Sequence, residues 1–99
     1  MSDESVLERA AARAVRAKAL LDDEILSEAF AALEMSYVAA WRGTTVDDAA
    51  GREKLFLAIN IVGKVRDHLA GVVANGQLAR AELKELAETA ERRKLFGII

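Results

Sequence analysis

The stretch that decides the fold is residues 55–73, which read LFLAINIVGKVRDHLAGVV. Apolar side chains recur in it at alternating steps of three and four residues, the spacing of a coiled-coil seam on one face of an α-helix. The seam consists of Leu55, Ala58, Val62, Val65, Leu69 and Val72. A second apolar row lies beside it and consists of Phe56, Ile59, Gly63, Ala70 and Val73, with only Arg66 interrupting it. Because one neighbouring helix cannot cover so wide a stripe, we expect the helix to contact two neighbours in the chain or another subunit.

The interface that we expect between copies is drawn from this stripe. It consists of Leu55, Ile59, Val62, Val65, Leu69 and Val72. Gly63 and Gly71 lie inside the same helix, where each costs about 1 kcal/mol relative to Ala, which predicts a close helix–helix approach at both positions. The alternative is that both glycines are tolerated positions facing solvent.

Outward from this stretch, the chain has few breaks and no proline. Thr45 reads as the N-cap of the long helix, with acidic residues in the first turn, and Asn75-Gly76 suits a left-handed C-cap that ends it. Before it, a helix capped by Asp22 or Asp23 runs to about Gly43. An Ala-rich helix over about residues 4–20 precedes that one, and a fourth helix follows over about residues 77–94.

These elements predict an all-α fold in a single domain over residues 1–99. We expect an antiparallel helical hairpin over residues 22–74, flanked by a basic N-terminal helix over 1–21 and a C-terminal helix over 77–95. An apolar tail over 95–99 ends the chain. Copies of this fold are expected to assemble into a bundle or ring. Trp41, near the tip of the hairpin, is expected to pack across the turn, the alternative being an exposed anchor for a partner.

The composition supports a small helical protein that gains from association. The chain has 99 residues, of which 53% are hydrophobic and 30% charged, with 20 Ala and 12 Leu. A chain of this length buries only about 60 to 65% of its unfolded surface, so the fold alone is marginal and an oligomer would stabilise it. The acidic N-terminus and the lack of a long apolar run predict a cytoplasmic protein with no membrane contact.

Residues suited to catalysis or metal binding are few. The absence of cysteine excludes disulfides, zinc-thiolate sites and iron–sulfur clusters, and one His with four Ser makes nucleophilic catalysis improbable. The carboxylates at 22–24 and 47–48 sit where helix caps belong, and no phosphate-binding loop occurs. We therefore expect no catalytic residue, no metal and no cofactor. The remaining enzyme alternative, a helical mutase with Asp48 ahead of Arg52-Glu53, would require a cleft lined by Arg42, Arg52 and Glu53.

Charge is unevenly distributed along the chain, whose net charge is −2. The candidate nucleic-acid contacts are Arg9, Arg13, Arg16 and Lys18. The three arginines step by four and three residues, so a helix presents them as one ridge able to follow phosphates without reading bases. The alternative is a solvated face, or pairing with the five acidic residues between 22 and 34.

The C-terminus combines a basic cluster with an apolar end. The candidate partner-binding residues are Arg92, Arg93, Leu95, Phe96, Ile98 and Ile99. Basic residues are expected at a helix C-terminus because of the helix dipole, but the apolar end has no such explanation. It is expected either to dock on its own fold or to bind another protein.

The layout of residues 20–86 resembles a known family. It is carried by Leu20-Leu21-Asp22, Phe30, Leu33, Tyr37, Trp41, Asp48, Gly51-Arg52-Glu53-Lys54-Leu55, Val65-Arg66, Leu69, Gly76 and Leu83. This pattern is similar to small helical proteins of the DNA-packaging region of tailed phages and phage-like gene transfer agents, above all the small terminase subunit. The resemblance implies a ring-forming homo-oligomer in a bacterial or phage-infected cell, which binds double-stranded DNA and recruits the large terminase subunit. The alternative is a small helical dimeric interaction protein that inhibits or scaffolds another protein.

Overall fold

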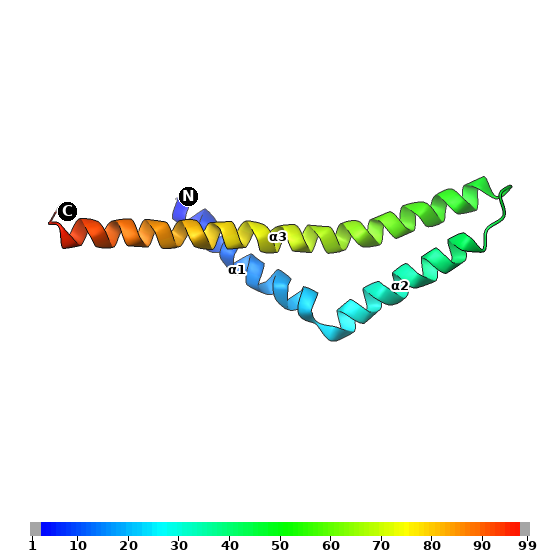
Figure 1. Ribbon diagram of the computed structural model, residues 1–99, viewed down its shortest axis with the longest axis horizontal. Coiled ribbons are helices and arrows are strands. Elements are labelled where there is room, and N and C mark those ends of the chain that lie inside the picture. Colours follow the sequence, from blue (N-terminus) through cyan, green and yellow to red (C-terminus); the bar gives the residue numbers. More distant parts are fainter. Residues whose placement is uncertain (1–2, 98–99) are drawn as a thin grey trace. The chain divides into compact units, whose positions relative to one another are not determined.

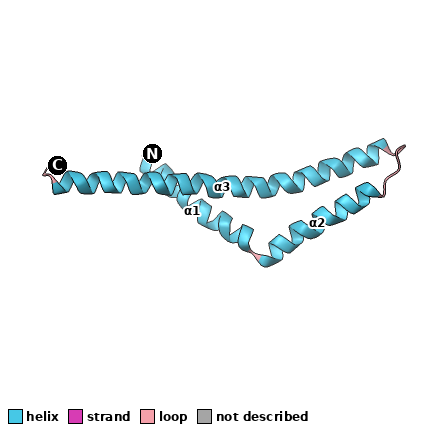
Figure 2. Cartoon of the chain, in the orientation of Figure 1, coloured by secondary structure: helices cyan, strands magenta, loops and turns pink. Residues whose placement is uncertain are grey.

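The structure, a computed structural model, describes residues 3–97. It contains the helices α1 (Asp3–Asp22), α2 (Glu24–Arg42) and α3 (Ala49–Leu95), and no strand occurs within the described range (Figures 1 and 2). The predicted all-α class is confirmed. The described residues form two compact units: 3–18 with 70–97, here called the terminal unit, and 19–69, here called the central unit. Helix α3 continues from one unit into the other.

Helix α2 begins where its sequence predicts. Asp23 has an extended backbone, and its Oδ1 accepts a hydrogen bond of 2.8 Å from the Leu26 N–H. This bond satisfies one of the N–H groups that have no partner within a helix, and the carboxylate lies at the positive end of the helix dipole. The helix ends at Arg42, and the Gly43 N–H donates to the Ala39 carbonyl.

The start of α3 differs from the prediction. Thr45 is not its cap: the Asp48 N–H closes a turn onto the Thr45 carbonyl, and α3 begins after Asp48. The Asp48 Oδ1 accepts from the Gly51 N–H at 3.0 Å, and its carbonyl accepts from the Arg52 N–H. Asp48, and not Thr45, is the N-cap because its carboxylate accepts from the N–H of the third helical residue and carries a negative charge at the positive end of the helix dipole.

Trp41 packs across the turn between α2 and α3, as the sequence predicts. The Arg52 guanidinium lies 5.0 Å from the centre of the indole ring and donates to the Thr44 Oγ1 at 3.1 Å. The Thr44 hydroxyl in turn donates to the Trp41 carbonyl. Arg52 thereby links the first turn of α3 to the last turn of α2 through a cation–π contact and a hydrogen bond.

In the central unit, α2 and residues 49–69 of α3 run side by side in opposite directions (Figure 1). Trp41 contacts Arg52 near the loop, and further along the Glu34 carboxylate lies 3.5 Å from the Arg66 guanidinium, which also lies over Phe30. The only residue of this unit that is buried is Val62, at 8% exposure. The two helices therefore contact each other without forming a hydrophobic core of more than one buried residue.

Helix α3 is longer than predicted, because it does not end at Asn75-Gly76. It continues to Leu95, so the separate C-terminal helix over 77–95 does not exist. The positive φ expected of a C-cap at Gly76 is absent there and is found instead at Gly97, where φ is 67°. Inside a helix, Gly costs about 1 kcal/mol and Asn up to about 0.7 kcal/mol relative to Ala, which packing of the surrounding turns overcomes.

Gly76 has a packing role in the terminal unit. A methyl group added there would overlap the Ala14 side chain of α1 and lie 2.8 Å from the Ala10 carbonyl oxygen. The buried side chains among the described residues of this unit are those of Ala14, Ala17 and Ala79. The close approach that the sequence predicts at Gly63 and Gly71 is wrong for the single chain, since an added methyl group at either position has no atom within 4 Å. The backbones of α1 and α3 approach at Gly76 instead.

We predict that Gly76→Ala destabilises the protein by about 1–2 kcal/mol, because the overpacking cost of about 1–3 kcal/mol exceeds the gain in helix propensity. Gly71→Ala, in the same helix and unit but in open space, is expected to stabilise by about 0.5–1 kcal/mol. Urea unfolding followed by circular dichroism measures both. Equal shifts for the two variants would show that α1 and α3 do not cross at Gly76.

We further predict that Arg52→Ala lowers the unfolding free energy by about 1 kcal/mol, because the cation–π contact and the hydrogen bond to Thr44 are both lost. Trp41 is the only tryptophan, so its fluorescence reports the change directly, as a red shift when the ring gains water. Arg42→Ala removes the same charge from an exposed neighbouring position and is the control. Identical emission spectra for the two variants would contradict the role of Arg52.

Candidate nucleic-acid and partner interfaces

The candidate nucleic-acid residues of α1 are all exposed, but they do not share one side of the helix. At 100° per residue, Arg9, Arg13 and Arg16 lie within an arc of about 60°. They lie about 100–160° from Ala14 and about 40–100° from Ala17, the two buried residues of α1. Lys18 lies about 140–180° from the arginines. The structure therefore brings three of the four candidates together as a ridge, here called the arginine ridge, and leaves Lys18 on another side.

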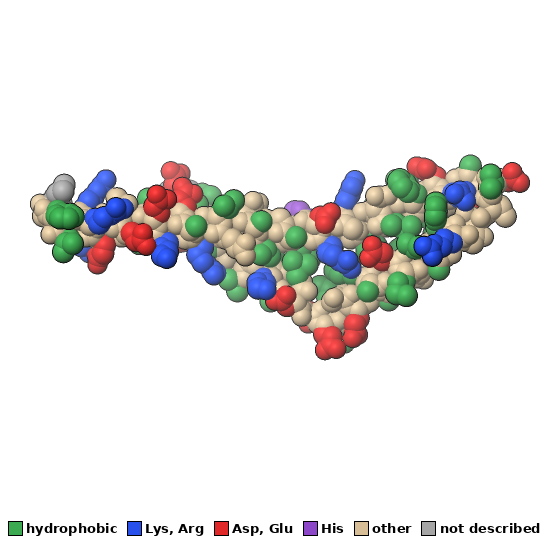
Figure 3. Space-filling view, in the orientation of Figure 1, with side chains coloured by type: hydrophobic (Ala, Val, Ile, Leu, Met, Phe, Trp, Pro, Cys, Tyr) green, Lys and Arg blue, Asp and Glu red, His purple; other side chains and the backbone are tan. Residues whose placement is uncertain are grey.

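Acidic side chains cluster elsewhere on the surface. Figure 3 shows them gathered at the junction between α1 and α2, where Asp22, Asp23 and Glu24 are exposed. The C-terminal part of α3 instead carries basic and acidic side chains in alternation (Figure 3). In the printed sequence, cations gather at the arginine ridge, where Glu8 lies among them, and again at Arg92-Arg93-Lys94 after Glu91.

The C-terminal candidates extend from the last turn of α3. Leu95 and Phe96 are 79% and 70% exposed, so these two side chains do not dock on the described chain. Arg92 and Arg93 are exposed beside them in the last helical turn. Ile98 and Ile99 lie outside the described residues. The described end of α3 therefore presents two large apolar side chains directly after a basic cluster.

The expected oligomer interface is largely occupied by packing within the chain. Val62 is buried, Leu55, Ile59, Leu69 and Val72 are half-buried, and Val65 is 46% exposed. Leu57 and Ile61, which the seam pattern does not select, expose 50% and 59% of their surface. The signal that identifies them is their spacing of four residues from one another and from Val65, which places all three along one side of α3.

The arrangement near the loop does not form the cleft that a mutase-like enzyme requires. A shallow hollow of about 400 Å³ is lined by Trp41, Val46, Ala49, Arg52, Glu53 and Phe56, and Arg42 is not among them. The Arg52 guanidinium is engaged by Thr44 and Trp41, and the Asp48 carboxylate caps α3. These groups hold the turn rather than converge on a bound molecule.

A larger open hollow of about 840 Å³ runs along α3 between Lys84 and Lys94. All the residues that line it belong to this one helix, so no opposing element encloses a ligand there.

Among residues 3–97, no group of three or more His, Asp or Glu side chains is placed to hold a metal ion. None of the helices in that range has the length and apolar character needed to cross a bilayer. No protein-family model matches the chain, and no curated protein and no solved structure matches it either.

Proposed function

We propose that the protein is a non-catalytic, oligomeric adaptor of the small-terminase kind in phage-like DNA packaging. It binds double-stranded DNA without sequence preference through the arginine ridge and recruits the large terminase subunit through the end of α3. The observation that carries the proposal is the ridge itself, because it places three exposed cations within about 60° of one another on α1, beside the buried Ala14 and Ala17. No aromatic or amide side chain accompanies them in a pattern that reads bases.

The ridge suits a backbone contact. Arg9 and Arg16 are seven residues apart, which is about 10 Å along the helix. Duplex DNA carries one negative charge per about 1.7 Å of its axis, so a ridge of this length meets several phosphates. Since the net charge of the chain is −2, the attraction is local and short in range, which agrees with weak binding to DNA of any sequence.

The central unit supplies the oligomeric part of the proposal. In this proposal, α2 and residues 49–69 of α3 correspond to the helical hairpin expected over residues 22–74, the element that serves as oligomerisation core in the family that the sequence resembles. A hairpin that buries one residue, Val62, lacks a core of its own. Burying its exposed apolar side chains against other copies stabilises it, because each such side chain contributes about 1.5–3 kcal/mol when fully covered.

The end of α3 supplies the docking site for the large subunit. Leu95 and Phe96 are exposed apolar side chains that can insert into an apolar groove of the large subunit. Arg92 and Arg93 favour a groove that is bordered by acidic residues, because opposite charges attract across an interface.

A second candidate function is a small dimeric interaction protein that inhibits or scaffolds another protein. The observation that favours it is that several large apolar side chains of the central unit are exposed, Met35, Leu57 and Ile61 among them, which a partner protein would cover. Salt-insensitive or absent DNA binding by the assembled protein would favour this candidate over packaging.

For DNA binding, we predict that replacing Arg9, Arg13 and Arg16 by Ala abolishes measurable affinity for a 30-base-pair duplex at low salt. The wild-type affinity is expected to fall with salt at a slope of about −3 in log–log terms, since each neutralised phosphate contributes about −0.9. Fluorescence anisotropy with two duplexes of unrelated sequence measures the affinity. Lys18→Ala, which removes a cation from another side of α1, is the control and should change the affinity less than about threefold. A slope near zero for the wild type would refute the DNA contact.

For partner binding, we predict that the double variant Leu95→Ser, Phe96→Ser weakens binding to the purified large subunit encoded by the same genome by at least about tenfold, from lost apolar burial. Folding and DNA affinity should be unchanged, because both side chains are exposed in the chain. The matched control is Leu78→Ser on the same helix, where the side chain is 70% exposed. Titration calorimetry gives the affinities. Equal losses in the two variants would place the docking site elsewhere.

A further inference from the structure

The middle of α3 contains two adjacent residues that are poor helix formers, Asn75 and Gly76. An Asn-Gly pair favours the end of a helix, because glycine adopts a positive φ without strain and asparagine tolerates one. In this chain α3 is continuous through both residues, and neither has a positive φ. An interaction from outside α3 therefore offsets the local preference of the pair.

The contact with α1 is that interaction. Gly76 is buried, and a methyl group added to it would overlap the Ala14 side chain. Gly76 and the buried Ala79 are three residues apart on α3, so they lie on one side of that helix. The buried Ala14 and Ala17 have the same spacing on α1. Helix α1 therefore covers the turn of α3 that follows Asn75.

This contact is close but not strongly stabilising. The side chains buried among the described residues of the terminal unit are all alanines, and each removes little apolar area from water. Segments that are held by few buried apolar contacts open locally while the rest of a protein stays folded. Release of α1 from α3 is thus an event expected below the free energy of global unfolding.

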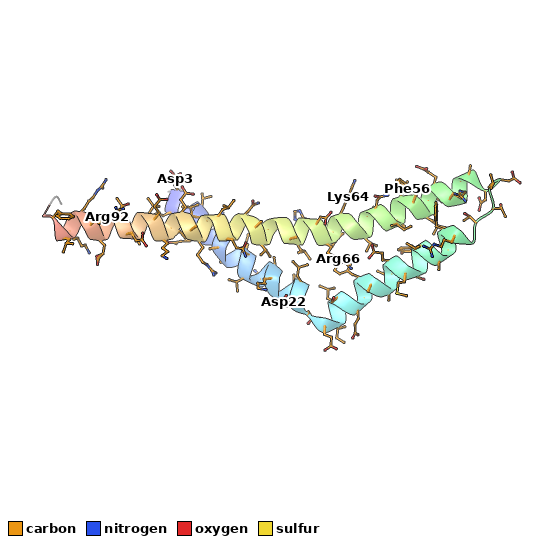
Figure 4. All side chains as sticks on the ribbon, viewed as in Figure 1. Asp3, Asp22, Phe56, Lys64, Arg66 and Arg92 are labelled. Atoms are coloured by element: carbon orange, nitrogen blue, oxygen red, sulfur yellow. The ribbon has the colours of Figure 1, made fainter. Side chains whose placement is uncertain are left out.

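The part of α3 beyond this contact forms without α1. Among residues 84–97, all but Thr89 are exposed. Figure 4 shows that α3 extends past the start of α1 at Asp3, toward Arg92. Glu88 and Arg92 are four residues apart in the order that stabilises a helix, and three basic residues lie in the last turn. This part stays helical when α1 leaves, so the turn that α1 covers is the place where α3 depends on α1.

We propose that α1 acts as a clasp on α3. Docking of α1 keeps α3 continuous through Asn75-Gly76, and release of α1 opens the helical turn over residues 75–80. The two events form one equilibrium, because the contact that holds α1 in place is also the contact that holds this turn. The clasp connects the helix that carries the arginine ridge to the half of α3 that ends in Leu95 and Phe96.

The position of the contact determines which ligands operate the clasp. A ligand shifts an equilibrium only when it binds the two states unequally. The arginine ridge is exposed while α1 is docked, so DNA can bind there without opening the clasp. Ala14 and Ala17 become accessible only on release, so a ligand that opens the clasp must contact their side of α1. The clasp is therefore independent of the proposed DNA contact, and its tests use neither DNA nor a partner.

The first test is hydrogen exchange of the full chain, resolved by residue with NMR. Ala14→Glu places a charge at a position that is 7% exposed and is expected to release α1. The amides of 77–80, whose helical acceptors are the carbonyls of 73–76, should then exchange at least about tenfold faster, while those of 86–90 keep their rates.

The matched control is Ala12→Glu, which introduces the same charge at an exposed position of α1 about 160° from Ala14. It is expected to leave the exchange rates of 77–80 unchanged. Unchanged rates at 77–80 in Ala14→Glu, or equal acceleration at 77–80 and 86–90, overturn the clasp.

The second test is a change of sign at Gly76. With Ala14 in place, Gly76→Ala is expected to speed exchange at 77–80, because the added methyl group pushes α1 away. In the Ala14→Glu background, the same substitution is expected to slow that exchange about fivefold, since α1 no longer opposes it and Ala has the greater helix propensity. An effect of the same sign in both backgrounds shows that the turn does not depend on α1.

The unmodified chain provides a third measurement that requires no variant to fold. Because release of α1 and opening of the turn are one event, the amides of 14–17 and of 77–80 should show the same protection and the same dependence on urea. Separate urea dependences for the two segments overturn the clasp.

Discussion

Burial within this chain is confined to small side chains, and the rest of the structure depends on that constraint. The apolar residues buried among 3–97 are Ala14, Ala17, Val62 and Ala79, and no side chain is fully enclosed. Alanine allows helix axes to approach closely but removes little apolar area from water, so contacts between these helices are close without being strongly stabilising. The single chain therefore gains little stability from its interior, and the proposed assembly would cover more apolar surface.

Gly76 and Arg52 show how the chain joins its helices despite this small core. In the terminal unit, the missing side chain of Gly76 lets α3 approach the backbone of α1 near Ala10 and Ala14. In the central unit, Arg52 and Arg66 cover the rings of Trp41 and Phe30 with flat cationic groups. In both units, the helices are joined by a few specific contacts and not by the burial of large side chains. They leave the large side chains of Leu57, Ile61 and Leu33 half-exposed.

Some residues of the candidate sites can be predicted from the sequence, and others only from the structure. The steps of four and three between Arg9, Arg13 and Arg16 suffice to place them on one side of a helix, so the arginine ridge is readable from the sequence. Lys18 belongs to the same charge cluster in the sequence but lies on another side of α1. The predicted seam around Val62 is a packing surface, and α2 covers it within the chain. The spacing of apolar residues alone does not show whether the covering helix belongs to the same chain or to another one.

By itself, the sequence determined the helical class, the start of α2 at Asp22 or Asp23 and the packing of Trp41 across the turn, because periodicity, capping and local turns depend on neighbours within a few residues. The structure selects Asp23 as the cap. Only the tertiary structure decided that α3 continues through Asn75-Gly76. In an isolated peptide, those two residues favour a break, since Gly loses more backbone entropy than any other residue on entering a helix. In the folded chain, Gly76 is the position where α1 must approach, so a residue distant in sequence, Ala14, determines its conformation.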